Sequence, residues 1–465
     1  MEGQAQQPVE PETAMASRLY VCVRLVALLL LLAAVVQSFL DASHYYGADL
    51  RARVVGARAM LRGLDPYFLP MRADQPETLQ DPFRYALQFS RCTYAPTLLW
   101  LYAPFANLVF TTQRWIWWCL EWTALLSSIY LLGQVMASSV VRNAYFLLAA
   151  VFFACGPSWR LDLERGQYYV FVLLGTSATV RLCLGRKGAE VNARRDHWWN
   201  GLPLGLAISI RLTPVVMVPA LWLAGYRKTA HGAAGFALVL IASTFSFRGA
   251  RLWQSYFRNA SLQNRFVTDA AFAAAAKQNL PAVPQTIEGI RQFNLLRWPA
   301  GNVTFASEVM PRIAARVHFL SDPANWNLYS MAVAGLICAA FTIAMIWSNV
   351  LPARDALGCA LLIGVLIDFF LPVRWSYADV TLLAPFAVLF PGMLGGGVLR
   401  LLTGVIAVAA LALAHTVGPL MVEPRILMVC PIGLTAAMAM YASLVLYQAV
   451  AKRYTYQAAN EMATR

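Results

Sequence analysis

The sequence has little charge for its length. Only 13% of its 465 residues are charged, whereas 59% are hydrophobic. Soluble domains average about 25% charged and about 45–50% apolar residues. A chain so poor in charge cannot cover a soluble surface, but runs of about 20 apolar residues can cross a bilayer as helices. The composition therefore indicates an all-α polytopic membrane protein.

Signatures of metal and nucleotide binding are also missing. The eight cysteines include no CxxC pair, so neither a disulfide framework nor a zinc site is indicated. The sequence contains no GxGxxG pattern and no Walker pattern, the Gly-rich loops that hold nucleotide phosphates. We therefore expect no metal and no cofactor.

The net charge of +14 is not gathered in one basic domain. The arginines are scattered between apolar runs, which excludes a nucleic-acid partner. Basic loops at membrane edges instead follow the positive-inside bias and contact anionic lipid headgroups.

About twelve segments have the length and composition of membrane spans. The shortest two are 142–156 and 376–391. The full set is 19–40, 94–111, 115–136, 142–156, 167–184, 201–225, 231–247, 326–348, 355–372, 376–391, 398–417 and 426–449.

The polar first 17 residues are expected to form a disordered cytoplasmic tail. Arg18 and Arg24 would hold that end inside. One integral-membrane domain would then cover 18–450, with outer loops at 41–93 and 248–325 and a cytoplasmic tail at 451–465.

The basic loop 185–200 conflicts with strict alternation of the spans, which would place it outside. An alternative makes 201–225 a re-entrant or broken helix and leaves one segment among 94–156 uncrossed. Arg211 and Pro214 in mid-span fit a broken helix that lines a polar cavity. Both topologies remain open at this point.

The first outer loop contains a helical pattern between Gly47 and Leu64. Because its apolar residues recur every three or four positions, we expect a helix lying along the membrane surface, with arginines toward headgroups. Gly63 is the expected C-cap, and Asp65 and Pro66 the stop. The apolar stripe comprises Leu50, Val54, Ala57, Leu61 and Leu64.

Asp49 stands in the first turn of this helix. A carboxylate there can simply cap the helix dipole, and Arg53 one turn later is a possible ion-pair partner. Alternatively, a carboxylate fixed at the membrane edge can act as a general base on a sugar hydroxyl.

The stretch GADLRARVVGARAMLRGLDPYF (47–68) resembles the first outer loop of the GT-C polyprenyl-phosphate-dependent glycosyltransferases of family 87, an alpha-mannosyltransferase-like group. Further segments follow in that family's order, although Tyr377 stands where a histidine is usual and Arg211 where a lysine is usual. These segments are TYAPTLLWLYAPFA (93–106), LERGQYYVFVLLG (163–175), GLPLGLAISIRLTPVVMVPALWL (201–223), NASLQNR (259–265) and LPVRWSYADVTLLAPF (371–386).

The resemblance implies a GT-C-type helix bundle with a juxtamembrane helix in the first outer loop. It implies transfer of a hexosyl group, mannosyl above all, from a polyprenyl-phosphate sugar to a glycolipid or glycan acceptor. The site would lie on the outer face of the plasma or inner membrane, and the transfer would invert the anomeric carbon.

The resemblance also assigns roles to residues. Asp49 would be the catalytic base. The donor phosphate would be bound by Arg211, Arg374, Arg258, Arg265 and Arg91, and the sugar or acceptor by Gln167, Tyr94, Tyr67, Trp375 and Tyr377.

Two other interpretations remain. A transporter or lipid flippase would carry ionisable residues deep in several spans, and few occur: Glu121, Arg211 and Asp368. A non-catalytic family member remains possible because Tyr377 cannot supply the positive charge of a histidine.

Overall fold

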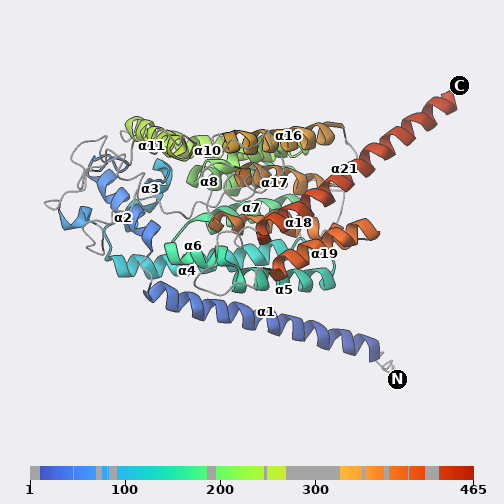
Figure 1. Cartoon of the computed structure of the whole chain (residues 1–465), viewed down its shortest axis with the longest axis horizontal. Coiled ribbons are helices and arrows are strands. Elements are labelled where there is room, and N and C mark those ends of the chain that lie inside the picture. Colours follow the sequence, from blue (N-terminus) through green and yellow to red (C-terminus); the bar gives the residue numbers. More distant parts are fainter. Residues whose placement is uncertain are drawn as a thin grey trace, which may run out of the picture.

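A computed structural model describes residues 11–44, 47–69, 76–80, 82, 92–185, 195–245, 249–268, 325–347, 351–370, 376–395, 397–413 and 429–464. In these ranges the regular elements are helices, and no strand occurs. This confirms the predicted all-α class. Most long helices run roughly along the molecule's long axis (Figure 1).

The longer helices form the body of the molecule. They are α1 (Pro11–His44), α4 (Phe110–Gly133), α5 (Ser139–Cys155), α7 (Tyr169–Leu184), α10 (Arg227–Thr244), α11 (Ala250–Thr268), α16 (Trp326–Trp347), α17 (Ala353–Phe370), α18 (Leu383–Met393), α19 (Val398–Leu413) and α21 (Val429–Thr464). Shorter elements are α2 (Ala48–Leu61), η1 (Glu77–Leu79), α3 (Pro96–Tyr102), η2 (Ala103–Phe105), α6 (Pro157–Arg165), η4 (Trp198–Gly201), α8 (Leu202–Ile210), η5 (Thr213–Val216), α9 (Met217–Leu223) and η9 (Ser376–Leu382).

Four described helices are long and apolar enough to cross a bilayer, namely α1, α4, α16 and α21. The pair α5 and α6, bent by 56° at its break, would be a fifth span. The predicted count of about twelve is not confirmed. One reason is length: the 16 residues of α7 extend about 24 Å, less than the roughly 30 Å of a bilayer core.

The segment predicted as a span at 94–111 is not one helix of spanning length. It contains the seven-residue helix α3, the short turn η2, and then the start of α4. Seven helical residues extend only about 10 Å. Pro96 starts α3, and Pro104 interrupts the helical run after it. For this reason the apolar composition alone overestimated the length of helix in this segment.

The segment 201–225 folds back on itself. α8 stops at Arg211, whose backbone is extended, and η5 and α9 continue after it. The backbone of Gly201, where the segment begins, lies directly against Thr229 and Ala233 in the first turns of α10. Tyr226, where the segment ends, immediately precedes α10. Both ends therefore meet at one place, and Arg211 lies at the far point of a re-entrant hairpin.

Helix α2 is packed into the protein, and its expected place along the membrane surface stays a prediction. Leu50, Val54 and Ala57 of the predicted apolar stripe are buried, but Arg53 and Val55 are buried too. The helix packs against η1, α3, α4 and α6, which cover more than one of its faces. Together with α3 it lies at the end of the bundle opposite both chain termini (Figure 1).

The predicted end of α2 is confirmed. The helix finishes at Leu61, and Gly63 adopts the left-handed φ of +73° that a C-terminal glycine supplies without strain. Asp65 then accepts the backbone N–H of Tyr67 at 2.9 Å, the local bond that makes aspartate a turn residue.

Candidate active site

Asp49 and Gln167 meet where α2 begins and α7 begins. The Gln167 Nε2 donates a hydrogen bond of 2.6 Å to the Asp49 Oδ2, and the Arg165 Nη1 lies 3.5 Å from the same oxygen. The Asp49 side chain keeps 26% of its surface exposed. Asp49 is therefore a fixed carboxylate with an open side, the arrangement that a general base needs.

Gly166 allows this close meeting of α2 with the turn between α6 and α7. It has a left-handed φ of +69°, and a Cβ atom added there would lie 2.8 Å from the Leu50 Cβ. No other residue type fits both the conformation and the space. The sequence Arg165-Gly166-Gln167 thus presents its two side chains to Asp49 from a turn pressed against α2.

Side chains of helices α2 and α4 hold the backbone of this turn by hydrogen bonds. Three of its carbonyl oxygens accept hydrogen bonds from buried side chains. The bonds run from the Arg53 Nη2 to Gly166 (3.0 Å), from the Arg114 Nη2 to Glu164 (3.2 Å) and from the Trp117 Nε1 to Gln167 (2.9 Å). Arg53 therefore holds the turn, and its guanidinium lies 4.2 Å from the Trp117 ring centre rather than pairing with Asp49 as its spacing suggested.

Four buried ionisable residues lie on the helices around Asp49. They are Arg53 of α2, Arg114 and Glu121 of α4, and Asp162 of α6. The Nε and Nη1 atoms of the two arginines have no hydrogen-bond partner among the described residues. The four side chains form no direct ion pair with one another, although they interact electrostatically at longer range. Burial disfavours the charged forms of the two carboxyl groups in this interior.

Replacing Glu121 by glutamine keeps the size of this fully buried side chain and gives it a neutral polar end. Because burial favours the neutral form of a carboxyl group, we expect the free energy of unfolding to change by less than about 1 kcal/mol. Thermal unfolding of the detergent-solubilised variant measures this. Destabilisation by about 3 kcal/mol would instead show that Glu121 carries a negative charge on which the buried arginines depend.

Arg211 lies on the other side of Gln167, at the break of the re-entrant hairpin. Its Nη1 donates to the Tyr168 hydroxyl at 3.3 Å, and its Nη2 lies 3.4 Å from the Asp368 Oδ1. Its guanidinium lies 4.4 Å from the ring centre of Tyr169, an attractive cation–π distance. The Arg211 side chain retains 17% exposure. Since Tyr168 follows Gln167 directly, Asp49 and Arg211 flank the same short segment.

Three predicted aromatic residues are buried around this segment. Tyr94 donates its hydroxyl to the backbone carbonyl of Asp49 at 2.6 Å, and Tyr67 donates to the carbonyl of Tyr94 at 2.7 Å. Tyr377 packs on Tyr169 with ring centres 5.1 Å apart. Burial, with the Asp49 carboxylate as a further cause, raises the pKa of Tyr94 well above its ordinary value. Tyr94 therefore remains a protonated donor that fixes the first turn of α2.

The remaining predicted residues are not gathered at Asp49 in the described part of the chain. Arg258 is exposed on α11, and Arg265 lies on the same helix. Arg91, Arg374 and Trp375 lie outside the described residues. Sequence reasoning missed Arg165 and Tyr168, although both adjoin the Gly166–Gln167 pair that it had selected.

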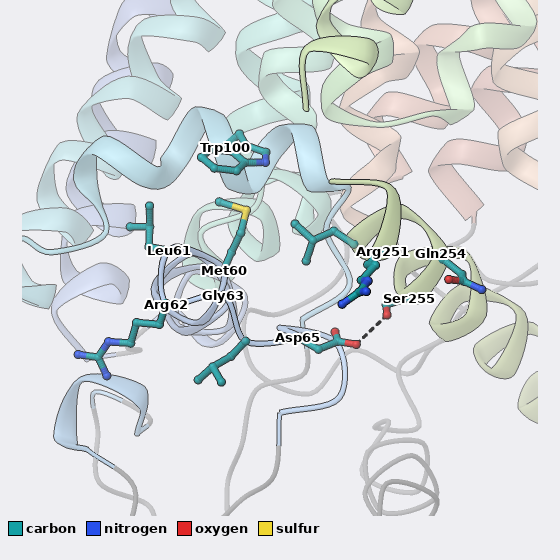
Figure 2. A pocket seen from close by; sticks show the side chains of 11 residues that line it. Met60, Leu61, Arg62, Gly63, Asp65, Trp100, Arg251, Gln254 and Ser255 are labelled. Atoms are coloured by element: carbon teal, nitrogen blue, oxygen red, sulfur yellow. Dashed lines mark hydrogen bonds between the residues drawn. The ribbon is translucent and has the colours of Figure 1, made fainter. Parts of the chain in front are cut away.

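Two hollows lie among the helices around α2 and α3. A pocket of about 750 Å³ lies between the C-terminal end of α2, Trp100 of α3 and the start of α11 (Figure 2). A smaller groove of about 170 Å³ is lined mainly by apolar side chains of α3, α4 and α7 and by Ile210 of α8. Within the described ranges, no cluster of three or more His, Cys, Asp or Glu residues is placed to hold a metal ion.

Comparison with known proteins gives one family match. A family model described as "Glycosyltransferase family 87" matches residues 93–373, more than half of the chain. The match includes Gln167 and Arg211 and begins after Asp49. Neither the curated proteins nor the solved structures contain a significant match to the chain.

Proposed function

The chain belongs to glycosyltransferase family 87, and from this premise we propose that it moves a hexosyl group, mannosyl above all, from a polyprenyl-phosphate sugar to a glycolipid or glycan hydroxyl. The protein is a membrane glycosyltransferase. Helix α2, whose first turn contains Asp49, lies at the opposite end of the bundle from both termini (Figure 1). With the termini inside, as the basic residues around α1 predict, the transfer takes place at the outer face.

The single observation that supports this reaction best is the placement of Asp49. Its carboxylate is held by Gln167 at 2.6 Å while a quarter of its side chain stays open. A base must be fixed, accessible and close to the substrate, and Asp49 meets the first two needs. An acceptor hydroxyl approaching the open side would donate to the carboxylate.

The proposed step is one displacement. The acceptor oxygen forms a bond to the anomeric carbon while Asp49 takes the hydroxyl proton. The bond from the anomeric carbon to the phosphate oxygen breaks, and the polyprenyl phosphate leaves with that electron pair. Phosphate is a stable leaving anion, so the step needs no general acid, and the sugar carbon inverts.

Arg211 is the proposed partner of the leaving phosphate. Its guanidinium has five N–H donors, and it contacts Tyr168, Thr213 and Asp368. Donors therefore remain for a phosphate oxygen on its exposed side. A fixed cation where negative charge develops stabilises the transition state.

The apolar groove beside Arg211 suits the prenyl chain. It is lined by residues such as Leu98, Phe171 and Ile210, and Ile210 is the residue before Arg211. Leu101 and Phe105, which also line it, are exposed, as expected for side chains that meet lipid. A donor with its phosphate at Arg211 could thus place its first prenyl units in this groove.

A donor panel tests the proposal. Wild-type protein in proteoliposomes would receive polyprenyl-phosphate mannose, polyprenyl-phosphate glucose or a nucleotide sugar, each radiolabelled, with a membrane glycolipid extract as acceptor. We expect transfer from a lipid-phosphate sugar, with mannose preferred, and none from the nucleotide sugar. Empty liposomes are the control, and transfer from the nucleotide sugar alone would contradict the proposal.

A further inference from the structure

One of the two hollows described above has no role in the displacement itself. It is the pocket of about 750 Å³ between the end of α2, α3 and the start of α11, here called the α2–α11 pocket (Figure 2). A volume of this size suits a ligand of several rings. Its lining is Met60, Leu61, Arg62, Gly63, Leu64, Asp65, Trp100, Arg251, Leu252, Gln254 and Ser255.

One wall of the pocket is fixed by Asp65. Its Oδ2 accepts the Ser255 hydroxyl at 2.7 Å, which joins the turn after α2 to α11, and its Oδ1 accepts the N–H of Tyr67 at 2.9 Å. Figure 2 shows the Asp65–Ser255 bond beside Arg251. The carboxylate is therefore held in one orientation, with lone pairs left over for a ligand.

The other polar groups of the pocket can donate. Arg62, Arg251 and Gln254 are exposed, and Trp100 adds an aromatic ring to the apolar part of the lining. A fixed acceptor, several donors and an aromatic ring match the hydroxyl groups and apolar faces of carbohydrate. A phosphate would gain from the arginines but would meet the negative charge of Asp65, so the mixture favours a neutral glycan.

The pocket is too far from Asp49 to hold the reacting sugar. Asp49 lies in the first turn of α2 and Arg62 follows its last residue. Thirteen residues of helix extend about 20 Å. A ligand in the pocket must therefore be a distant part of a substrate whose reacting hydroxyl lies at Asp49.

We propose that the α2–α11 pocket binds the non-reacting sugars of an extended glycan acceptor. The inference rests on the proposed function, because it assigns a second position along the acceptor of that reaction. Sugars bound here would anchor the acceptor through contacts that are equal in ground state and transition state. Such contacts lower KM and leave kcat unchanged.

The test compares acceptors of different length. The double variant Arg251→Ala with Gln254→Ala removes exposed side chains from the first turn of α11. We expect its KM for the long glycolipid acceptor to rise about tenfold, as for the loss of a hydrogen bond to a charged group. Its kcat, its KM for the donor and its KM for a single-sugar acceptor should equal those of the wild type. Ser261→Ala, an exposed position of α11 away from the pocket lining, is the matched control.

A binding measurement separates this inference from the reaction. Fluorescent long acceptor would be titrated onto Asp49→Asn protein, with and without the pocket substitutions. Weaker binding only with those substitutions supports the pocket even if no transfer occurs, in which case the proposed function alone fails. Unchanged acceptor binding would overturn the inference. An equal loss of affinity for the single-sugar acceptor would overturn it too. The same holds if the pocket substitutions weaken binding only to phosphatidylglycerol vesicles, a result that would indicate a structural lipid.

Discussion

Asp49→Asn is expected to lower kcat for sugar transfer by about a thousandfold and to leave donor binding unchanged. Loss of a general base typically lowers the rate 10²- to 10⁴-fold, which is the contribution that general-base catalysis makes. Asparagine can still accept the 2.6 Å bond from Gln167, so the turn should keep its place. Radiolabel transfer at saturating donor and acceptor measures kcat, and a separate binding assay measures the affinity for the donor.

The control for Asp49 is Glu77→Gln, which changes an exposed carboxylate of η1, an element that packs against α2. It should transfer at the wild-type rate. Undiminished kcat in both Asp49→Asn and Asp49→Ala would rule out Asp49 as the base. A loss of donor binding in Asp49→Asn would instead make the residue part of the donor site.

Arg211→Gln is expected to lower kcat/KM for the lipid-linked donor by about 10²- to 10³-fold. Removal of one fixed group that stabilises developing charge has a cost of this size. Arg211→Lys should recover part of the activity, because it restores the charge but not the planar fork of donors. Steady-state kinetics with varied donor measures both, and Arg227→Gln, an exposed arginine of α10, is the matched control.

Loss of Arg211 also leaves Asp368 without a cation at 3.4 Å. The double variant Arg211→Gln with Asp368→Asn separates the two effects, because it removes both charges together. We expect the double variant to recover stability but not activity. Recovery of activity would mean that Arg211 serves only to neutralise Asp368.

Local features of the chain were predictable from sequence. The helix over 47–64, its end near Gly63 and the Asp65 turn all follow from periodicity and turn chemistry, and all are observed. Pro214 and Arg211 in one apolar run indicated a broken helix as one of two topologies, and the structure has that form. These features depend on residues that are close in the chain, so a short window of sequence suffices to predict them.

The setting of α2 was not predictable in the same way. An apolar stripe with arginines outside it indicates a surface helix as readily as a buried one. Arg53 is fully buried because Gly166 and Trp117, more than 60 residues further on, provide its acceptor and its ring contact. The meeting of Asp49 with Arg165 has the same origin, since the left-handed turn at Gly166 brings the two helices together.

The anomeric configuration of the product tests the central claim most directly. Wild-type protein would react with a lipid-phosphate donor of known configuration, and NMR would identify the new glycosidic linkage. The account predicts inversion, because the acceptor oxygen attacks the sugar carbon directly while Asp49 takes its proton. Retention would contradict it, because one direct displacement with attack opposite the leaving phosphate inverts the sugar carbon.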